Sequence, residues 1–244
     1  MYLYAAAKVY KIISSSEDQE MLQRVINRLK EWCDKWLVSV NASKCNQVSY
    51  IAKHKIDTNY YISNNNTKHF IESVDHIKDL GVTFDSHLSF YDHIQEKINK
   101  AYSMIGLIKR NFIHMDKNTF CLLYKALVRP HVEYAHSVWY PYKKGDITDI
   151  EKVQKRATKL IISLKNYSYK ERLQILNLPT LKYRRLRGDM IDVFKIANNM
   201  CDASSVPVLP FDKSHITRGN WARLPYRYTT EIVHFAYQTV LYTP

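Results

Sequence analysis

The residues of this chain best suited to chemistry are cations gathered in two short segments of its second half. The first segment, residues 150–159, places its cations at helical positions i, i+3, i+4 and i+7, so that they share one stripe of a helix. The second segment, residues 183–187, is equally basic. Such stripes contact phosphates, although a solvated charged face is an equally good reading of the first segment alone. The candidate nucleic-acid contacts are Lys152, Lys155, Arg156, Lys159, Arg184 and Arg187.

No catalytic group stands beside these cations in the sequence. Asp75, His76, Asp79 and Asp85 lie close together, but an isolated cluster of this kind in a strand region is more often surface polarity than a metal site. Arg185 and Asp189 are spaced i, i+4 and can form an ordinary surface ion pair, which weakens the case for Arg185 as a phosphate contact. The sequence therefore predicts binding without chemistry, and no metal site.

Composition and charge favour a polyanionic partner. The 244 residues carry a formal net charge of +13, and 46% of them are hydrophobic, which is ample for a buried core. Attraction to phosphates through counterion release is the natural consequence of such an excess. Four cysteines without a Cys-x-x-Cys pair and the lack of a membrane-length apolar run predict an intracellular protein, cytoplasmic or nuclear, with no membrane partner.

The elements that must position these residues follow from the hydrophobic periodicity. A helix is predicted from Ser16 to Leu37, with Trp32 and Trp36 packed in the core, and helices dominate again from Ser89 onward. Between them, residues 47–52, 60–63, 71–74 and 76–85 are predicted to form a small antiparallel sheet.

The helical half is expected to contain five segments. Ser89 caps the first, whose apolar residues are Ile94, Ile98, Ala101, Ile105, Ile108 and Phe112. A second helix runs from Asp116 to Pro130, Asp146 caps the basic helix, Ser168 caps a short one, and residues 181–199 form the last. The fold class is thus α+β, mainly α: a small antiparallel sheet with a packed helix, then a helical bundle. The predicted domains are 1–87, 88–200 and an irregular segment, 201–244.

Several phrases, read in order, match one family. They are Leu29–Trp36 with Asn41 and Ser43–Cys45, Lys78–Val82, Leu88–Ile94, Tyr124–Pro130, Glu133–Ala135 with Val138–Trp139, Ile150–Lys159, Tyr169–Leu173 and Leu181–Asp189. Together they resemble the C-terminal part of the reverse transcriptase of non-LTR retrotransposons of the jockey-like type. The resemblance covers roughly residues 3 to 200.

The resemblance implies a role for each part of the chain. Residues 1–87 would be the end of the palm and a primer-grip-like region around Asp79, Leu80, Gly81 and Val82, and residues 88–200 would be a basic thumb-like domain. The family's two adjacent metal-binding aspartates would fall at Ala6 and Ala7, whose methyl groups cannot hold Mg²⁺. No catalytic residue is therefore expected in this chain. Mg²⁺ is expected only for the intact polymerase, whose fingers and other palm strands would precede residue 1.

The function that follows is a fragment of an RNA-directed DNA polymerase. Such a fragment would bind primer/template RNA, DNA or an RNA/DNA duplex without polymerising alone. A non-enzymatic basic nucleic-acid-binding module and a non-functional pseudogene product are the alternatives. The oligomeric state does not follow from the sequence.

Overall fold

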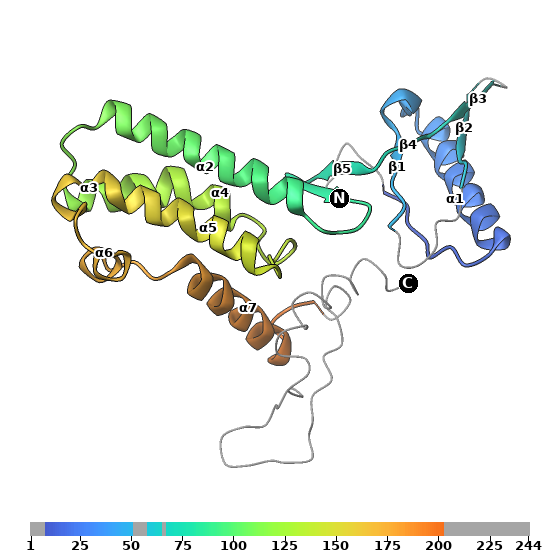
Figure 1. Cartoon of the computed structure of the whole chain (residues 1–244). Coiled ribbons are helices and arrows are strands. Elements are labelled where there is room, and N and C mark those ends of the chain that lie inside the picture. Colours follow the sequence, from blue (N-terminus) through green and yellow to red (C-terminus); the bar gives the residue numbers. More distant parts are fainter. Residues whose placement is uncertain (1–7, 51–57, 65–66, 203–244) are drawn as a thin grey trace, which may run out of the picture. The chain divides into compact units, whose positions relative to one another are not determined.

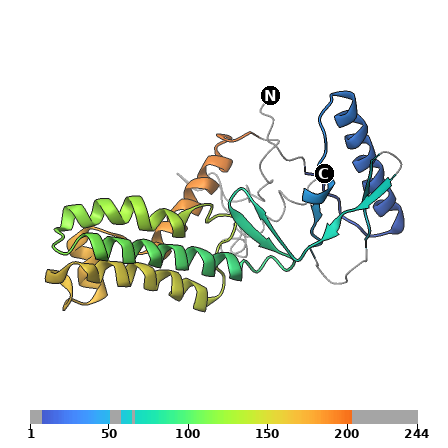
Figure 2. The same cartoon turned by 90° about the horizontal axis from the view of Figure 1, so that it is seen from above.

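The computed structural model describes residues 8–50, 58–64 and 67–202, and this part of the chain divides into two compact units between Ser89 and Phe90. The first unit contains one long helix and short strands, and the second is built from helices α2 to α7 (Figures 1 and 2). The predicted fold class, α+β and mainly α, is confirmed. No helix in the described ranges is long and apolar enough to cross a membrane.

Helix α1 (Ser16–Lys35) opens the first unit. A capping box starts it, in which the Ser15 hydroxyl accepts from the Asp18 backbone N–H and the Asp18 carboxylate accepts from the Ser15 N–H. The prediction that Trp32 and Trp36 pack in the core is wrong, since they are 43% and 62% exposed and lie against each other, with ring centroids 6.3 Å apart. Elsewhere on the helix, the Gln23 side chain forms hydrogen bonds with both backbone groups of Tyr61.

The strands of the first unit form three separate pairs in the described residues, where one antiparallel sheet was predicted. Two pairs are antiparallel and the third is parallel. Residues of β3 and β4 are exposed throughout, so little apolar surface exists to gather the pairs into one sheet. The pairs are β1 (Asn46–Gln47) with β4 (Glu72–Ser73), β2 (Tyr61–Asn64) with β3 (Thr67–Phe70), and β5 (His76–Asp79) with β6 (Val82–Asp85).

Helix α2 (Tyr91–Asn111) begins the second unit and buries the residues predicted for its core, except Phe112, which is 40% exposed. Its N-cap is Phe90 in the left-handed region, and the Ser89 hydroxyl donates to Asp85. The predicted cap at Ser89 is therefore wrong, because that hydroxyl is used to close the preceding turn.

The second predicted helix consists of three pieces. Helix α3 (Lys117–Leu123), capped by Asp116 as predicted, passes into a π-helical turn at Tyr124–Val128 and then into α4 (Arg129–Glu133). The wider turn restarts the hydrogen-bond ladder, so Pro130 falls in the first turn of α4, where its missing N–H costs nothing. The chain therefore stays helical beyond Pro130, where the sequence predicted an end.

Helices α5 (Lys144–Ala157), α6 (Tyr169–Leu176) and α7 (Leu181–Ala197) complete the second unit. The α5 helix begins before Asp146, which lies buried in its first turn, so the predicted cap there is wrong. Ser168 caps α6 together with Glu171, as predicted. Helix α5 lies along α2, and α7 starts beside α5 and runs away from this layer at an angle (Figure 1).

Candidate nucleic-acid interface

The α5 helix and the 3₁₀ turn that follows it carry an exposed row of cations. Lys152, Lys155, Arg156 and Lys159 are all exposed, and we call these four residues the α5 cation row. The opposite side of the same helix is closed into the core, with Ile150, Val153 and Ala157 at most 1% exposed, followed by the buried Ile161 and Leu164. The predicted two-faced geometry is therefore present, while contact with nucleic acid stays a prediction.

The cations of the row are held loosely. Lys152 donates to Asp149 at 2.8 Å, and this hydrogen bond raises the pKa of the lysine. Solvent screens an exposed pair of this kind, so Lys152 can exchange Asp149 for another anion. Neither Lys155 nor Lys159 lies in an ion pair within the described residues. The row thus offers its charge to solvent.

Tyr102 adds an aromatic ring that the sequence reading missed. The guanidinium carbon of Arg156 lies 5.2 Å from the centroid of the Tyr102 ring, which belongs to α2. This contact exists because α2 packs along α5, and no pattern in the sequence relates positions 102 and 156. Tyr102 orients the Arg156 guanidinium by a cation–π interaction.

Arg172 of α6 fixes the end of α5 that carries the row. Its side chain is 2% exposed and donates to the Thr158 hydroxyl at 3.0 Å and to the backbone oxygens of Tyr167 and Lys155 at 2.6 and 3.3 Å. Carbonyls at a helix C-terminus have no partner within the helix, so this buried cation satisfies one of them. Sequence reasoning did not single out Arg172, because its position in a short helix carries no such signal.

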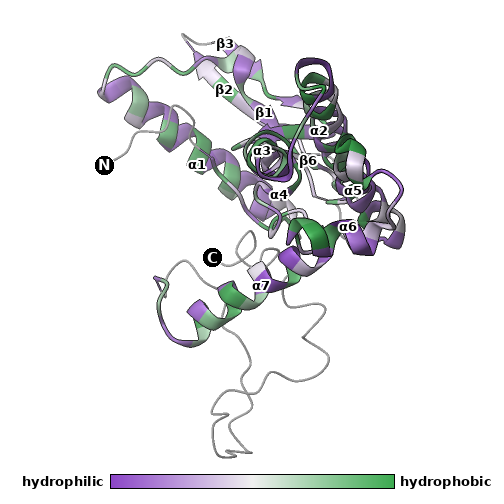
Figure 3. Ribbon diagram, turned by 90° about the vertical axis from the view of Figure 1, so that its left-hand side faces the viewer, coloured by the Kyte–Doolittle hydropathy of each residue, from purple (hydrophilic) through white to green (hydrophobic). Residues whose placement is uncertain are grey.

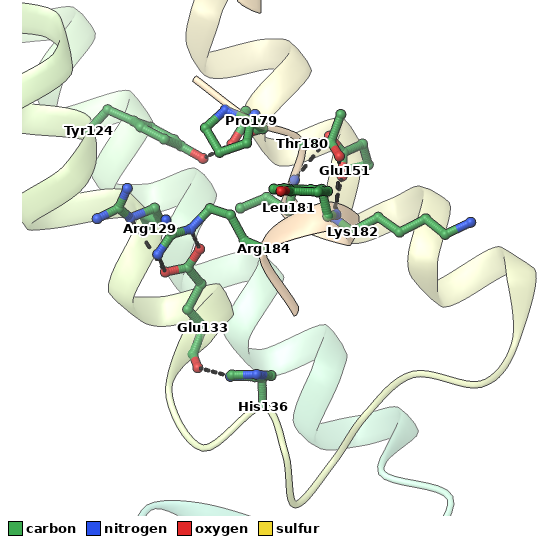
Figure 4. A network of polar contacts seen from close by, with 12 residues as sticks. Tyr124, Arg129, Glu133, His136, Glu151, Pro179, Thr180, Leu181, Lys182 and Arg184 are labelled. Carbon is green, nitrogen blue, oxygen red and sulfur yellow. Dashed lines mark hydrogen bonds and ion pairs between the residues drawn. The ribbon is translucent and has the colours of Figure 1, made fainter. Parts of the chain in front are cut away.

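Arg184 is engaged inside the protein. Its guanidinium makes a two-bond ion pair with Glu133 of α4, which also lies 3.4 Å from Arg129 (Figure 4). The hydrogen bond to Glu133 raises the pKa of Arg184. Paired in this way, Arg184 joins α7 to α4, and we do not include it in the interface proposed below.

Arg185 and Asp189, also on α7, were expected to form a surface ion pair, and this expectation is wrong. Arg185 and Asp189 are 1% and 5% exposed and face the bundle. Burial lowers the pKa of Arg185. Asp189 Oδ1 lies 3.5 Å from His136 Nε2, and this contact raises the pKa of the imidazole. Arg187, in contrast, is exposed, and it belongs to α7 and not to α5.

The start of α7 is seated on α5 by hydrogen bonds (Figure 4). Glu151 accepts from the backbone N–H groups of Leu181 and Lys182, at 3.4 and 3.2 Å, and so caps α7 from another helix. Gln154 accepts from the Tyr124 hydroxyl at 2.5 Å and donates to the Pro179 carbonyl at 2.9 Å. One helix therefore carries the cation row on its exposed face and the seat of α7 on its buried side.

The primer-grip-like residues form a hairpin turn in the first unit. Asp79 pairs with Val82 across the turn, while Leu80 and Gly81 have φ values of 44° and 81°. Leu80 is 70% exposed at the tip, and Asp79 forms an ion pair with Lys8. The role expected for these four residues stays a prediction.

Metal binding finds no support in the described part of the chain. No group of three or more His, Cys, Asp or Glu side chains there could hold an ion. The described carboxylates therefore do not fit a two-metal centre. Ala6 and Ala7 lie outside the described residues.

Comparison with known proteins identifies the class to which this chain is similar, that of RNA-directed DNA polymerases of non-LTR retrotransposons, as predicted. The chain is 24% identical over 147 residues to a probable RNA-directed DNA polymerase from transposon X-element of Drosophila melanogaster, a match that covers 57% of this chain. It is 30% identical over 128 residues, or 50% of its length, to the RNA-directed DNA polymerase from mobile element jockey of Drosophila funebris.

The matches cover 15% and 13% of these two relatives, so the chain corresponds to a small part of either protein. No family model matches the chain. No solved structure matches it either.

Proposed function

We propose that the second unit grips the phosphate backbone of RNA, DNA or an RNA/DNA duplex through the α5 cation row. The observation that carries this proposal is the exposure of four cations on one side of a helix whose other side is closed into the core. The similarity to RNA-directed DNA polymerases, whose substrates are nucleic acids, supports the same partner. The net charge of +13 supplies long-range attraction.

Such a grip positions the nucleic acid without reading its sequence. The row extends over about 10 Å of helix axis, at about 1.5 Å per residue, and reaches more than one phosphate. It lies at the C-terminal end of α5, where the helix dipole stabilises cations when no nucleic acid is bound. Arg172 and Tyr102 keep the end of the helix and Arg156 in place, which lowers the entropic cost of binding.

The wider assignment follows from the resemblance. Residues 1–87 would correspond to the end of the palm with a primer-grip-like hairpin, and residues 88–200 to a thumb-like domain. We further propose that the chain binds primer/template without polymerising alone, because alanines stand where the family's metal-binding aspartates are expected.

Fluorescence anisotropy with a labelled RNA and the matching RNA/DNA hybrid, at several salt concentrations, tests the grip. The logarithm of the association constant should fall with the logarithm of salt concentration by about 0.7 to 0.9 for each phosphate neutralised. Replacing all four residues of the row by alanine should reduce this slope by about 3.

A matched variant controls for the loss of charge. Lys109, Arg110, Lys117 and Lys125 are four other exposed cations of the second unit, and their replacement by alanine removes the same charge. The control should keep most of the salt dependence. Equal losses in both variants would show that only net charge matters, and binding without any salt dependence would disprove the grip.

A further inference from the structure

Helix α7 presents an apolar stripe to solvent. Leu186, Met190 and Phe194 are 46%, 64% and 60% exposed, and hydrophobic positions recur along the helix in Figure 3. The face that α7 turns toward the bundle is largely polar, with Arg185 and Asp189 buried beside Leu181. Surface helices normally bury the apolar face, so this stripe has the character of an interface.

The exposed side of α7 also has the spacing of a coiled-coil seam. Five of its residues follow one another at alternating steps of three and four, which is the pattern of positions a and d in a heptad repeat, and Phe194 lies beside them. None of them is buried in the described structure. The seam residues are Tyr183, Leu186, Met190, Val193 and Ala197.

We propose that this seam binds the same seam of a second copy of the chain, with the two α7 helices antiparallel. In that register Leu186 packs against Ala197 of the second copy and Met190 against Val193 of the second copy, each twice by symmetry. Large side chains then meet small ones along the core, as well-packed interfaces require. This inference concerns self-association and does not depend on the nucleic-acid grip.

Charges beside the seam select the antiparallel arrangement. In a parallel pair, positions g and e of the heptad face each other, and Lys182 would lie against Arg187 of the second copy. In the antiparallel pair, Arg187 instead lies beside Phe194 of the second copy, where an arginine and an aromatic ring attract each other. The arrangement thus replaces two repulsions by two cation–π contacts and gives the exposed Arg187 a partner.

The pairing is expected to be weak. One pair of helices of 17 residues buries less surface than the 1,200 to 2,000 Å² or so of stable complexes, so the dissociation constant should be micromolar or higher. Sedimentation velocity of the whole chain over a concentration series measures it. Met190→Lys should give a monomer at all concentrations, whereas Ile162→Lys, at a 62% exposed apolar residue outside the seam, should leave the association unchanged.

Cross-linking distinguishes the two orientations. In the antiparallel pair, residue 186 lies about 16 Å along the axis from its own counterpart, at about 1.5 Å per residue, but beside residue 197. Under mild oxidation, Leu186→Cys alone should therefore not cross-link, and a mixture of Leu186→Cys and Ala197→Cys chains should. The unchanged chain, with its four free cysteines, is the background control.

A monomer at every accessible concentration would overturn the proposal, as would association that survives Met190→Lys. Cross-linking of Leu186→Cys with itself would overturn the antiparallel orientation. Ile162, Leu186 and Met190 are exposed and Ala197 is half-buried, so circular dichroism should show unchanged folding of each variant.

Discussion

The buried hydrogen bond between Tyr124 and Gln154 provides the sharpest test of how the second unit holds together. Tyr124 is 0% exposed and Gln154 is 1% exposed, and the tyrosine hydroxyl donates to the amide oxygen at 2.5 Å. Gln154 also donates to the carbonyl of Pro179, an exposed residue, so water can replace this donor when the amide is removed. Removal of one partner should therefore cost far more than removal of both.

The expected changes in free energy of unfolding follow from this asymmetry. Gln154→Leu leaves a buried hydroxyl without an acceptor, which costs about 2 kcal/mol, and loses the bond to Pro179, about 0.5 kcal/mol more. Tyr124→Phe leaves the amide oxygen without a donor, again about 2 kcal/mol. The double variant leaves neither the hydroxyl nor the amide oxygen unpaired. It should lose about 1 kcal/mol, well short of the sum of the two single losses, about 4.5 kcal/mol.

Urea denaturation at 25 °C, followed by far-ultraviolet circular dichroism, measures the free energy of unfolding of the unchanged chain, both single variants and the double variant. Gln174→Leu, at an exposed glutamine of α6, controls for the substitution itself and should change stability by less than about 0.5 kcal/mol. Additive losses, within about 0.5 kcal/mol, would refute the reasoning because they would mean that the two side chains do not depend on each other.

Three further predictions concern local features. Because Asp189 raises the pKa of His136, the pair should stabilise the fold fully below about pH 6.5 and lose this effect as pH rises through the folded-state pKa. The free energy of unfolding, measured at pH 6 to 8.5, checks this, and His136→Gln should make that free energy depend less on pH. Gly106→Ala, with nothing within 4 Å of the added Cβ, should raise the free energy of unfolding by about 0.5 to 1 kcal/mol, but Gly188→Ala should bring no such gain, since that Cβ would lie 2.8 Å from His136 Nε2. Leu80→Asn should stabilise the β5–β6 hairpin by about 0.5 to 1 kcal/mol, because Asn adopts positive φ more readily than Leu, and an unchanged or lower melting temperature of the first unit would contradict this.

The sequence predicted those features that depend on local periodicity. The core residues of α2, the buried face of α5 and the exposure of the α5 cation row all follow from spacing along a single helix. Capping by Asp116 and Ser168 was likewise readable, because each cap lies within three residues of the backbone groups it serves. Gln154 carried an overlooked signal: it lies four residues after Ile150 and three before Ala157, on the apolar side of its helix.

Features that depend on contacts between elements were not predictable. Nothing near Arg184 in the sequence indicates that Glu133, on α4, would engage it. Arg185 and Asp189 look like a surface pair at i, i+4, and their burial depends on how α7 crosses the bundle. The π-helical turn at Tyr124–Val128 similarly results from packing, and it moved Pro130 from a helix end to a helix start.

The polar seat of α7 has a thermodynamic consequence. Glu133, Glu151 and His136 hold this helix by ion pairs and hydrogen bonds, and Leu181 is the one apolar residue among those that α7 buries. Exposure of apolar surface raises the heat capacity on unfolding and exposure of polar surface lowers it, so release of α7 should contribute almost nothing to that quantity. In calorimetry, a separate detachment of α7 should therefore leave nearly equal baselines before and after it.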